Sequence, residues 1–165
     1  MAGHDAFSPP EVALLVETRG VAKATAPVLT TFVLGLVAGA FIALGAVLAI
    51  TIGTGSELGF GPTRWLAGAG FSLGLILVVV AGAELFTGNN LIVMSVVAGH
   101  VPIRRLLANW GVVYLGNAIG ALSVVIMVMV AEWWRQDDLG VGAVALTTAA
   151  AKTSLPFSWS SLGAC

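Results

Sequence analysis

Long apolar runs dominate the chain and predict three membrane-spanning helices. The first span, Thr31 to Ile52, holds 22 residues without a charge. At about 1.5 Å per residue, a helix of this length crosses a hydrocarbon core of about 30 Å. The third span, about Leu106 to Ala131, is followed by the cluster EWWRQDD, whose Trp133 and Trp134 fit the aromatic belt of a membrane interface. The pattern therefore predicts an all-α membrane protein.

The middle apolar run, Trp65 to Val97, is interrupted by the polar stretch GAELFTGNN, Gly82 to Asn90. A run of 33 residues is too long for one plain span. We therefore predict two half-helices, about Leu66 to Ala81 and about Asn90 to Val97, joined by a non-helical turn. Irregular backbone at membrane depth is tolerated only where it is buried in protein or lines a cavity. Transporters repeatedly place substrate sites at such breaks, which makes this stretch the predicted functional site.

The two ends of the chain are less apolar than the middle. Residues 1–30 are polar and mixed, and EVALLVETRGVAKA predicts a helix there. This helix is either amphipathic and lies on the membrane surface or is an ordinary cytosolic lead-in. Residues 31–138 form the predicted three-helix transmembrane repeat. Within the remaining segment, residues 139–165, the 13 residues Leu139 to Ala151 are too few for a full span and suit a buried or re-entrant piece.

The composition supports a membrane protein and excludes several other classes. The chain is 58% hydrophobic and 9% charged, with a mean hydropathy of +1.02, whereas soluble domains carry about 25% charged residues. A net charge of −1 gives no indication of nucleic-acid binding. The N-terminus has no signal-peptide pattern, and the single cysteine, Cys165, cannot form an internal disulfide. We predict a multi-pass protein of the inner (plasma) membrane.

The positive residues predict the orientation in the lipid bilayer. Four of them fall on the side of the N-terminus and three on the other side, where acidic residues gather as well, so we place the N-terminus in the cytoplasm. The first group is Arg19, Lys23, Arg104 and Arg105, and the second is Arg64, Arg135 and Lys152.

Glu84 is the only ionisable residue deep in a predicted span and is a functional-site candidate for that reason. Two roles remain open: its carboxylate accepts hydrogen bonds from loop N–H groups and fixes the loop, which we favour, or it takes part directly in permeation. Thr87 is the better lining candidate, because its hydroxyl can donate to an anion. Asn89 and Asn90 are expected to cap the second half-helix.

Four apolar residues beside the break are candidates for narrowing a path, and plain packing is the alternative role for each of them: Phe71, Leu75, Leu85 and Phe86. We expect neither an enzyme nor a bound metal or cofactor. Both histidines, His4 and His100, lie outside the spans, which argues against a haem-binding membrane anchor.

Three segments resemble the formate/nitrite transporter family. FSLGLILVVVAGAELFTGNNLIVMS resembles its broken second helix, NWGVVYLGNAIGA its third, and AGAFIALGAVLAI its first. The resemblance covers about Phe7 to Phe157 in order. It implies an aquaporin-like fold built from two inverted three-helix repeats, homopentamers with one pore per protomer, and transport of small monovalent anions such as formate, nitrite or hydrosulfide. A bare anion in an apolar pore is costly, so transient protonation or hydrogen bonding is expected on the way.

The resemblance also assigns roles to individual residues. Thr87 falls on the family's omega-shaped loop and faces the pore, with Leu85 and Phe86 beside it. Phe71 and Leu75 fall on apolar constrictions, and Lys152 matches the family lysine near the vestibule that helps to draw in the anion. The remaining residues of the stretch are expected to shape the loop: Gly82, Glu84, Gly88, Asn89 and Asn90.

The chain departs from the family pattern after the third helix. The family has six spans, with a histidine on the fifth, and this sequence contains only the first repeat and the approach to the fourth helix. We expect a truncated chain and hypothesise a frameshift near Phe157, with SWSSLGAC read out of frame. Three interpretations stay open: a transporter, an inactive fragment of one, or a half-transporter that pairs with a second half.

Overall fold

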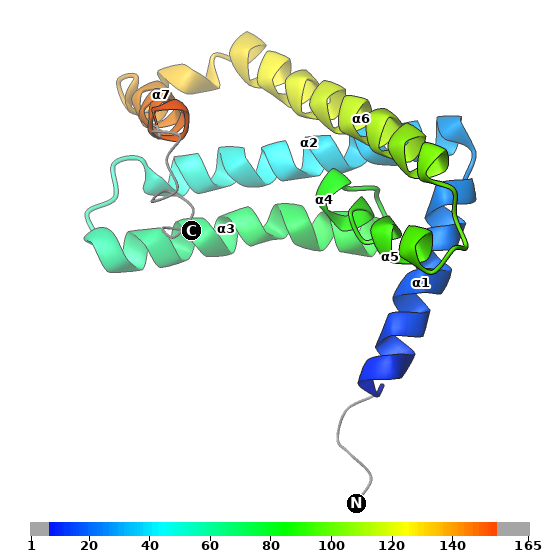
Figure 1. The fold of residues 1–165 in the computed structure, drawn as a ribbon. Helices are drawn as coiled ribbons and strands as arrows, with labels where there is room; N and C mark the ends of the chain where they lie inside the picture. Colours follow the sequence, from blue (N-terminus) through cyan, green and yellow to red (C-terminus); the bar gives the residue numbers. More distant parts are fainter. Residues whose placement is uncertain (1–6, 155–165) are drawn as a thin grey trace, which may run out of the picture.

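The computed structural model describes residues 7–154, and these residues form an all-helical unit (Figure 1). Three helices are long and apolar enough to cross a membrane, as predicted. The elements are α1 (Pro9–Thr25), α2 (Val28–Gly53), α3 (Phe60–Ala81), α4 (Phe86–Asn89), α5 (Ile92–Val97), α6 (Ile103–Val130), η1 (Trp133–Arg135) and α7 (Gly140–Thr153).

The spanning helices begin earlier than the apolar pattern predicted. α2 and α6 each begin directly after a proline, Pro27 and Pro102, which stands at the N-cap position. Proline suits a helix start because its missing N–H group would have no partner in the first turn. The polar or charged residues that follow these prolines, such as Arg104, are therefore helical although they lie outside the apolar runs.

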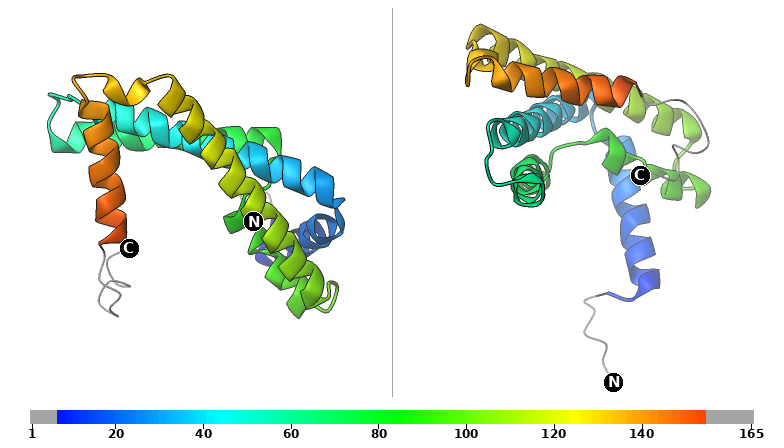
Figure 2. Two further views of the ribbon diagram at one scale, coloured as in Figure 1. Left: turned by 90° about the horizontal axis from the view of Figure 1, so that it is seen from above. Right: turned by 90° about the vertical axis from the view of Figure 1, so that its left-hand side faces the viewer.

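α2 lies between α3 and α6, and glycines allow these helices to approach closely (Figures 1 and 2). A Cβ atom added to Gly74 of α3 would lie 2.7 Å from the backbone oxygen of Phe41. One added to Gly116 of α6 would lie 2.8 Å from the backbone oxygen of Phe32. Small residues drive helix association in membranes because close backbone approach increases van der Waals contact. Ala38, fully buried on α2, lies in the resulting core.

α1 crosses one end of this three-helix unit and packs against α5 (Figure 1). Gly20 is buried beside Ser95, whose hydroxyl donates to the backbone oxygen of Glu17 over 2.8 Å. At the start of α1, the hydroxyl and the N–H group of Ser8 both donate to the Glu11 carboxylate, and they hold its pKa below the usual value. The N-terminal helix is thus part of the folded unit. Its position relative to a membrane stays a prediction.

The segment after α6 folds as η1 and the short helix α7, which contacts the far end of α2 (Figure 2). α7 corresponds to the predicted short apolar piece and is 14 residues long. A wholly apolar cavity of about 260 Å³ lies where α2, α6, η1 and α7 meet. The segment SWSSLGAC, on which the frameshift hypothesis rests, lies outside the described residues.

Candidate functional site

The middle apolar run is broken where the polar stretch predicted it. α3 ends at Ala81, and Gly82 follows in the left-handed conformation with φ of 63°, which glycine adopts without the steric cost of a Cβ. The backbone is extended at Leu85, and the chain then forms α4 before α5. α5 begins at Ile92, slightly later than the predicted start at about Asn90, and Phe86–Asn89 form a helical turn within the stretch that was predicted to be non-helical.

Asn117 of α6 fixes the extended part of the break against α2. Its side-chain oxygen accepts a hydrogen bond from the N–H of Phe86 over 3.0 Å. Its amide nitrogen donates to the backbone oxygens of Gly35, over 2.7 Å, and Glu84, over 3.0 Å. One side chain thus satisfies backbone groups on two segments, as buried or half-buried polar groups require. The sequence analysis did not single out Asn117, although an amide in the middle of an apolar span was a signal for it.

Glu84 has a different partner from the one expected. Its carboxylate accepts a hydrogen bond from the Lys23 ammonium over 2.7 Å, and only 13% of the Glu84 side chain is exposed. The expectation of loop N–H donors is wrong, because among residues 7–154 the hydrogen-bond donor to this carboxylate is Lys23 and not a backbone N–H group. The N–H of Ala83 donates to Val78, and that of Glu84 itself donates to Leu34 of α2. The carboxylate instead binds the ammonium group of Lys23, which extends from α1.

Asn89 and Asn90 do not cap the second half-helix, which corrects the prediction. No side chain caps α5. Asn89 is fully buried, accepts from Lys23 over 3.0 Å and donates to the side chain of Asn109 over 2.9 Å. The indole of Trp110 donates to its backbone oxygen. Asn89 therefore shapes the loop through partners on α1 and α6, while Asn90 is exposed.

A groove of about 580 Å³ lies beside the break, between α1 and the end of α3. It combines three of the predicted pore residues, Leu75, Leu85 and Thr87, with the charged residues Arg19, Lys23 and Glu84. The Thr87 side chain is exposed and makes no side-chain hydrogen bond among residues 7–154. Its hydroxyl is therefore available to a molecule in the groove.

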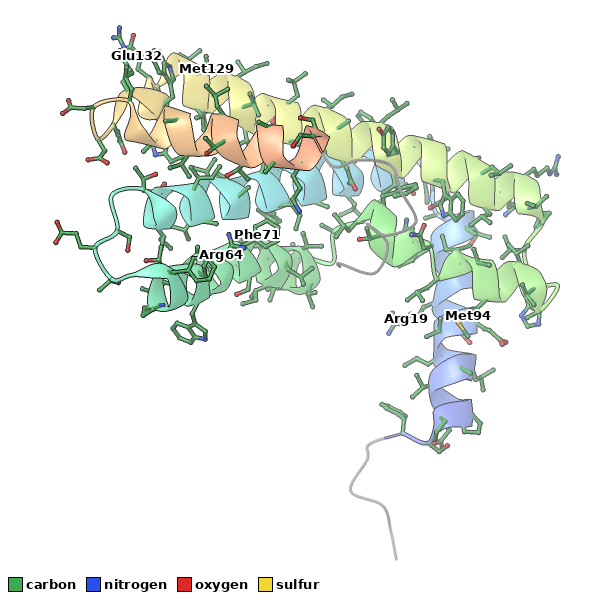
Figure 3. The ribbon with its side chains drawn as sticks, turned by 60° about the vertical axis from the view of Figure 1, so that its left-hand side comes forward. Arg19, Arg64, Phe71, Met94, Met129 and Glu132 are labelled. Carbon is green, nitrogen blue, oxygen red and sulfur yellow. The ribbon has the colours of Figure 1, made fainter. Side chains whose placement is uncertain are left out.

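The other predicted pore residues do not line this groove. Phe71 lies on α3 about one turn before Leu75 and is 44% exposed (Figure 3). Phe86 packs edge-on against Trp110 and Tyr114 of α6, with ring centroids 5.8 and 5.7 Å apart. Lys152 is exposed in the last turn of α7. The pore roles of Phe71, Phe86 and Lys152 stay predictions.

The ion pair between Lys23 and Glu84 is expected to stabilise the break measurably. Lys23→Met and Glu84→Gln should each lower the free energy of unfolding by about 1–3 kcal/mol, because each leaves a partly buried partner without its countercharge. The double variant should lose less than the sum, with a coupling of about 1–2 kcal/mol. Denaturant unfolding of the four proteins in detergent micelles measures this coupling.

The matched control is the ion pair between Arg135 and Glu132, which has the same 2.7 Å separation but side chains that are 58% and 60% exposed. Replacing Arg135 with glutamine should leave stability unchanged within error, since solvent screens exposed pairs. Equal effects at the two pairs would contradict a special role for Lys23.

A helical membrane unit with a broken helix and a partly polar groove at the break has the architecture of a channel or transporter. The sequence profile of the formate/nitrite transporter family matches residues 10–164, and the chain belongs to this family.

Relatives and a solved structure agree with this assignment. The formate channel FocA of Escherichia coli strain K12 is 44% identical over 124 residues, 74% of this chain and 44% of that protein. The uncharacterised transporter YrhG of Bacillus subtilis strain 168 is 42% identical over 70% of this chain and 44% of its own length. A pentameric formate channel with formate bound matches with a TM-score of 0.68 and 32% identity, over 78% of this chain and 51% of its own. The chain thus spans about half the length of these relatives.

Proposed function

We propose that the groove at the break forms one wall of a path for small monovalent anions, with formate as the first candidate and nitrite as the second. The observation that carries this proposal is the position of Thr87. Its hydroxyl, which has no side-chain partner among residues 7–154, lies within the break, in a groove that also contains the apolar side chains of Leu75 and Leu85. Membership of the formate/nitrite transporter family and the formate channels among the relatives support the choice of anion. The proposed role is transport and not catalysis.

The proposed path works by replacing water step by step. Apolar side chains such as Leu75 and Leu85 strip the anion of water, which is costly for an unpaired charge. Thr87 lowers this cost by donating a hydrogen bond, and a proton taken up with the anion would lower it further. The Lys23–Glu84 pair adds no net charge to the groove, since its opposite charges lie 2.7 Å apart.

A closed path needs a wall opposite the groove. Much of α3 is left without a neighbour in this unit: Ile76, Val79 and Val80 are between 51% and 80% exposed. We propose that a second three-helix unit, in inverted orientation, faces α3 and the break, and that the assembly is a pentamer in the plasma membrane with the N-terminus in the cytoplasm. The described residues then form one half of the closed path.

Removing the hydroxyl of Thr87 tests the proposed path. Thr87→Val should lower formate flux about tenfold or more, because a hydrogen bond to a charged group contributes about 1.5–3 kcal/mol. Thr87→Ser, which keeps the hydroxyl, should stay within about threefold of the parent protein. Flux is measured in proteoliposomes that contain the protein purified from its own membrane with any chain that co-purifies.

Two results would contradict the proposal. Equal formate flux with Thr87→Val and with the parent protein would remove Thr87 from the path. Uptake no faster than in protein-free vesicles would contradict transport through this protein. A melting temperature unchanged in Thr87→Val is the control for folding, because the Thr87 side chain has no partner to lose among the described residues.

A further inference from the structure

The groove beside the break carries one uncompensated positive charge. Its charged lining residues are Arg19, Lys23 and Glu84. Lys23 and Glu84 form an ion pair, and Lys23 donates a second hydrogen bond to Asn89. Arg19 forms neither an ion pair nor a side-chain hydrogen bond with any residue between 7 and 154. The guanidinium group of Arg19 therefore keeps its charge and its donors for another molecule.

The position of Arg19 suits a ligand that approaches the break. Arg19 lies four residues before Lys23, and residues four apart occupy the same face of a helix. The side chain extends from α1 on the side of α3 in Figure 3, away from Met94 of α5. It also lines a neighbouring cavity of about 230 Å³ that includes Gly88 and Leu91. Arg19 thus lines both the groove and this neighbouring cavity, and residues of the α4 region line each of them.

We propose that Arg19 is the outer binding residue for the transported anion and that it favours planar anions with two oxygen acceptors, such as a carboxylate. This inference rests on the proposed function and deepens it. A guanidinium group offers a rigid fork of donors that matches a carboxylate in a bidentate geometry. Lys23 suits this role less well, because its ammonium group has no planar fork and already donates to Glu84 and Asn89. The anion passes from Arg19 to Thr87, which lines the same groove.

Direct binding to Arg19 can be measured without any transport. The side-chain Nε resonances of the arginines are recorded in detergent micelles while sodium formate is added at constant ionic strength. The Arg19 resonance should shift and saturate, whereas the resonance of Arg104, which is exposed and lines none of the cavities described above, should shift weakly and without saturation. Equal shifts at Arg19 and Arg104, or no shift at Arg19, would overturn the inference.

The role in recruitment predicts a dependence on salt. Arg19→Gln should lower formate flux about fivefold or more at low ionic strength and at formate concentrations below saturation. The deficit should shrink as salt is added, since screening weakens the attraction of an exposed charge. Arg19→Lys keeps the positive charge, so its flux should depend on salt as in the parent protein. It lacks the planar fork of donors, so it should not prefer formate over a spherical anion. Arg104→Gln is the control and should leave flux unchanged.

The result separates this inference from the proposed function. If Thr87→Val lowers flux but Arg19→Gln behaves like the parent protein at every salt concentration, the path stands and the role of Arg19 is overturned. If Arg19→Gln lowers maximal flux equally at low and high salt, the residue supports the fold of α1 and does not bind the anion. If the Arg19 resonance saturates with formate but flux does not depend on Thr87, the binding residue stands and the proposed path fails.

Discussion

Gly39→Val is expected to prevent α2 from packing against α6 and to leave little folded protein in the membrane. A Cβ atom at Gly39 would overlap the backbone oxygen of Asn117, and backbone in the middle of a helix cannot rotate away as a side chain can. Valine adds two further methyl groups to this clash. The loss of stability should reach or exceed the upper end of the range of about 1–3 kcal/mol that overpacking usually costs. Detergent-resistant folded protein, measured by size-exclusion chromatography and denaturant titration, gives the result.

Gly111→Val is the matched control for this substitution. Gly111 lies on α6, and a Cβ atom there would meet nothing within 4 Å. The added side chain should change the stability by less than about 0.5 kcal/mol, as is usual for exposed positions. If both variants unfold equally, glycine at position 39 would matter for a reason other than helix contact. If neither unfolds, the α2–α6 contact would be looser than the structure shows.

Asn117→Leu is expected to cause the second large effect, because it removes the side chain that fixes the break. The substitution leaves the N–H of Phe86 and the backbone oxygen of Glu84 without this partner, and the oxygen of Gly35, inside α2, loses its second hydrogen bond. Each unsatisfied group in a water-poor site costs about 1–3 kcal/mol, so the two groups together should cost about 2 kcal/mol or more. Flux should fall as well, since the loop that presents Thr87 loses its anchor to α2 and α6.

Asn117→Asp separates the contributions to this anchor. Aspartate keeps an acceptor for the N–H of Phe86 but can no longer donate to Gly35 and Glu84, and it places a negative charge beside their two backbone oxygens. It should therefore be about as unstable as the leucine variant. Asn90→Leu is the control, because Asn90 is exposed and makes no side-chain hydrogen bond among the described residues. A stable Asn117→Leu protein would mean that solvent or lipid groups replace the amide at little cost.

The apolar pattern predicted the parts of the fold that depend on local sequence. Three long apolar runs predicted the three spanning helices, and the polar stretch from Gly82 to Asn90 predicted where the middle one breaks. Both features follow from requirements that hold along one segment: enough length to cross the bilayer, and no unpaired backbone in lipid.

The partners of the break could not be predicted in the same way. Glu84 pairs with Lys23, which lies 61 residues away in the sequence. Asn89 bonds to Asn109 and not to the helix that follows it. Helix capping is a local preference, and it predicted the wrong partner for Asn89. A fully buried amide forms hydrogen bonds with the polar groups that tertiary packing brings close to it. The amides in the span NWGVVYLGNAIGA were a signal for such a network, but no role was predicted for them.

α1, α2 and α6 together determine the shape of the break. α1 provides Lys23, α2 provides the backbone oxygens of Leu34 and Gly35, and α6 provides Asn109 and Asn117. Groups from three helices thus bind the irregular backbone, while the Thr87 side chain stays exposed in the groove. Within the described part of the chain the hydroxyl of Thr87 makes no side-chain hydrogen bond, which fits the proposed role for a group at the break of a helix.

Cysteine modification in membranes tests whether Thr87 faces an anion path. The single native cysteine is replaced by Cys165→Ser, and Thr87→Cys is treated with a charged thiosulfonate reagent that does not dissolve in lipid. Ile126→Cys, at an exposed apolar position of α6 that lines none of the cavities described above, is the control. We predict that Thr87→Cys reacts, that formate slows its reaction in a saturable way, and that Ile126→Cys stays unmodified. A Thr87→Cys protein that does not react, or that reacts at the same rate with and without formate, would contradict the account.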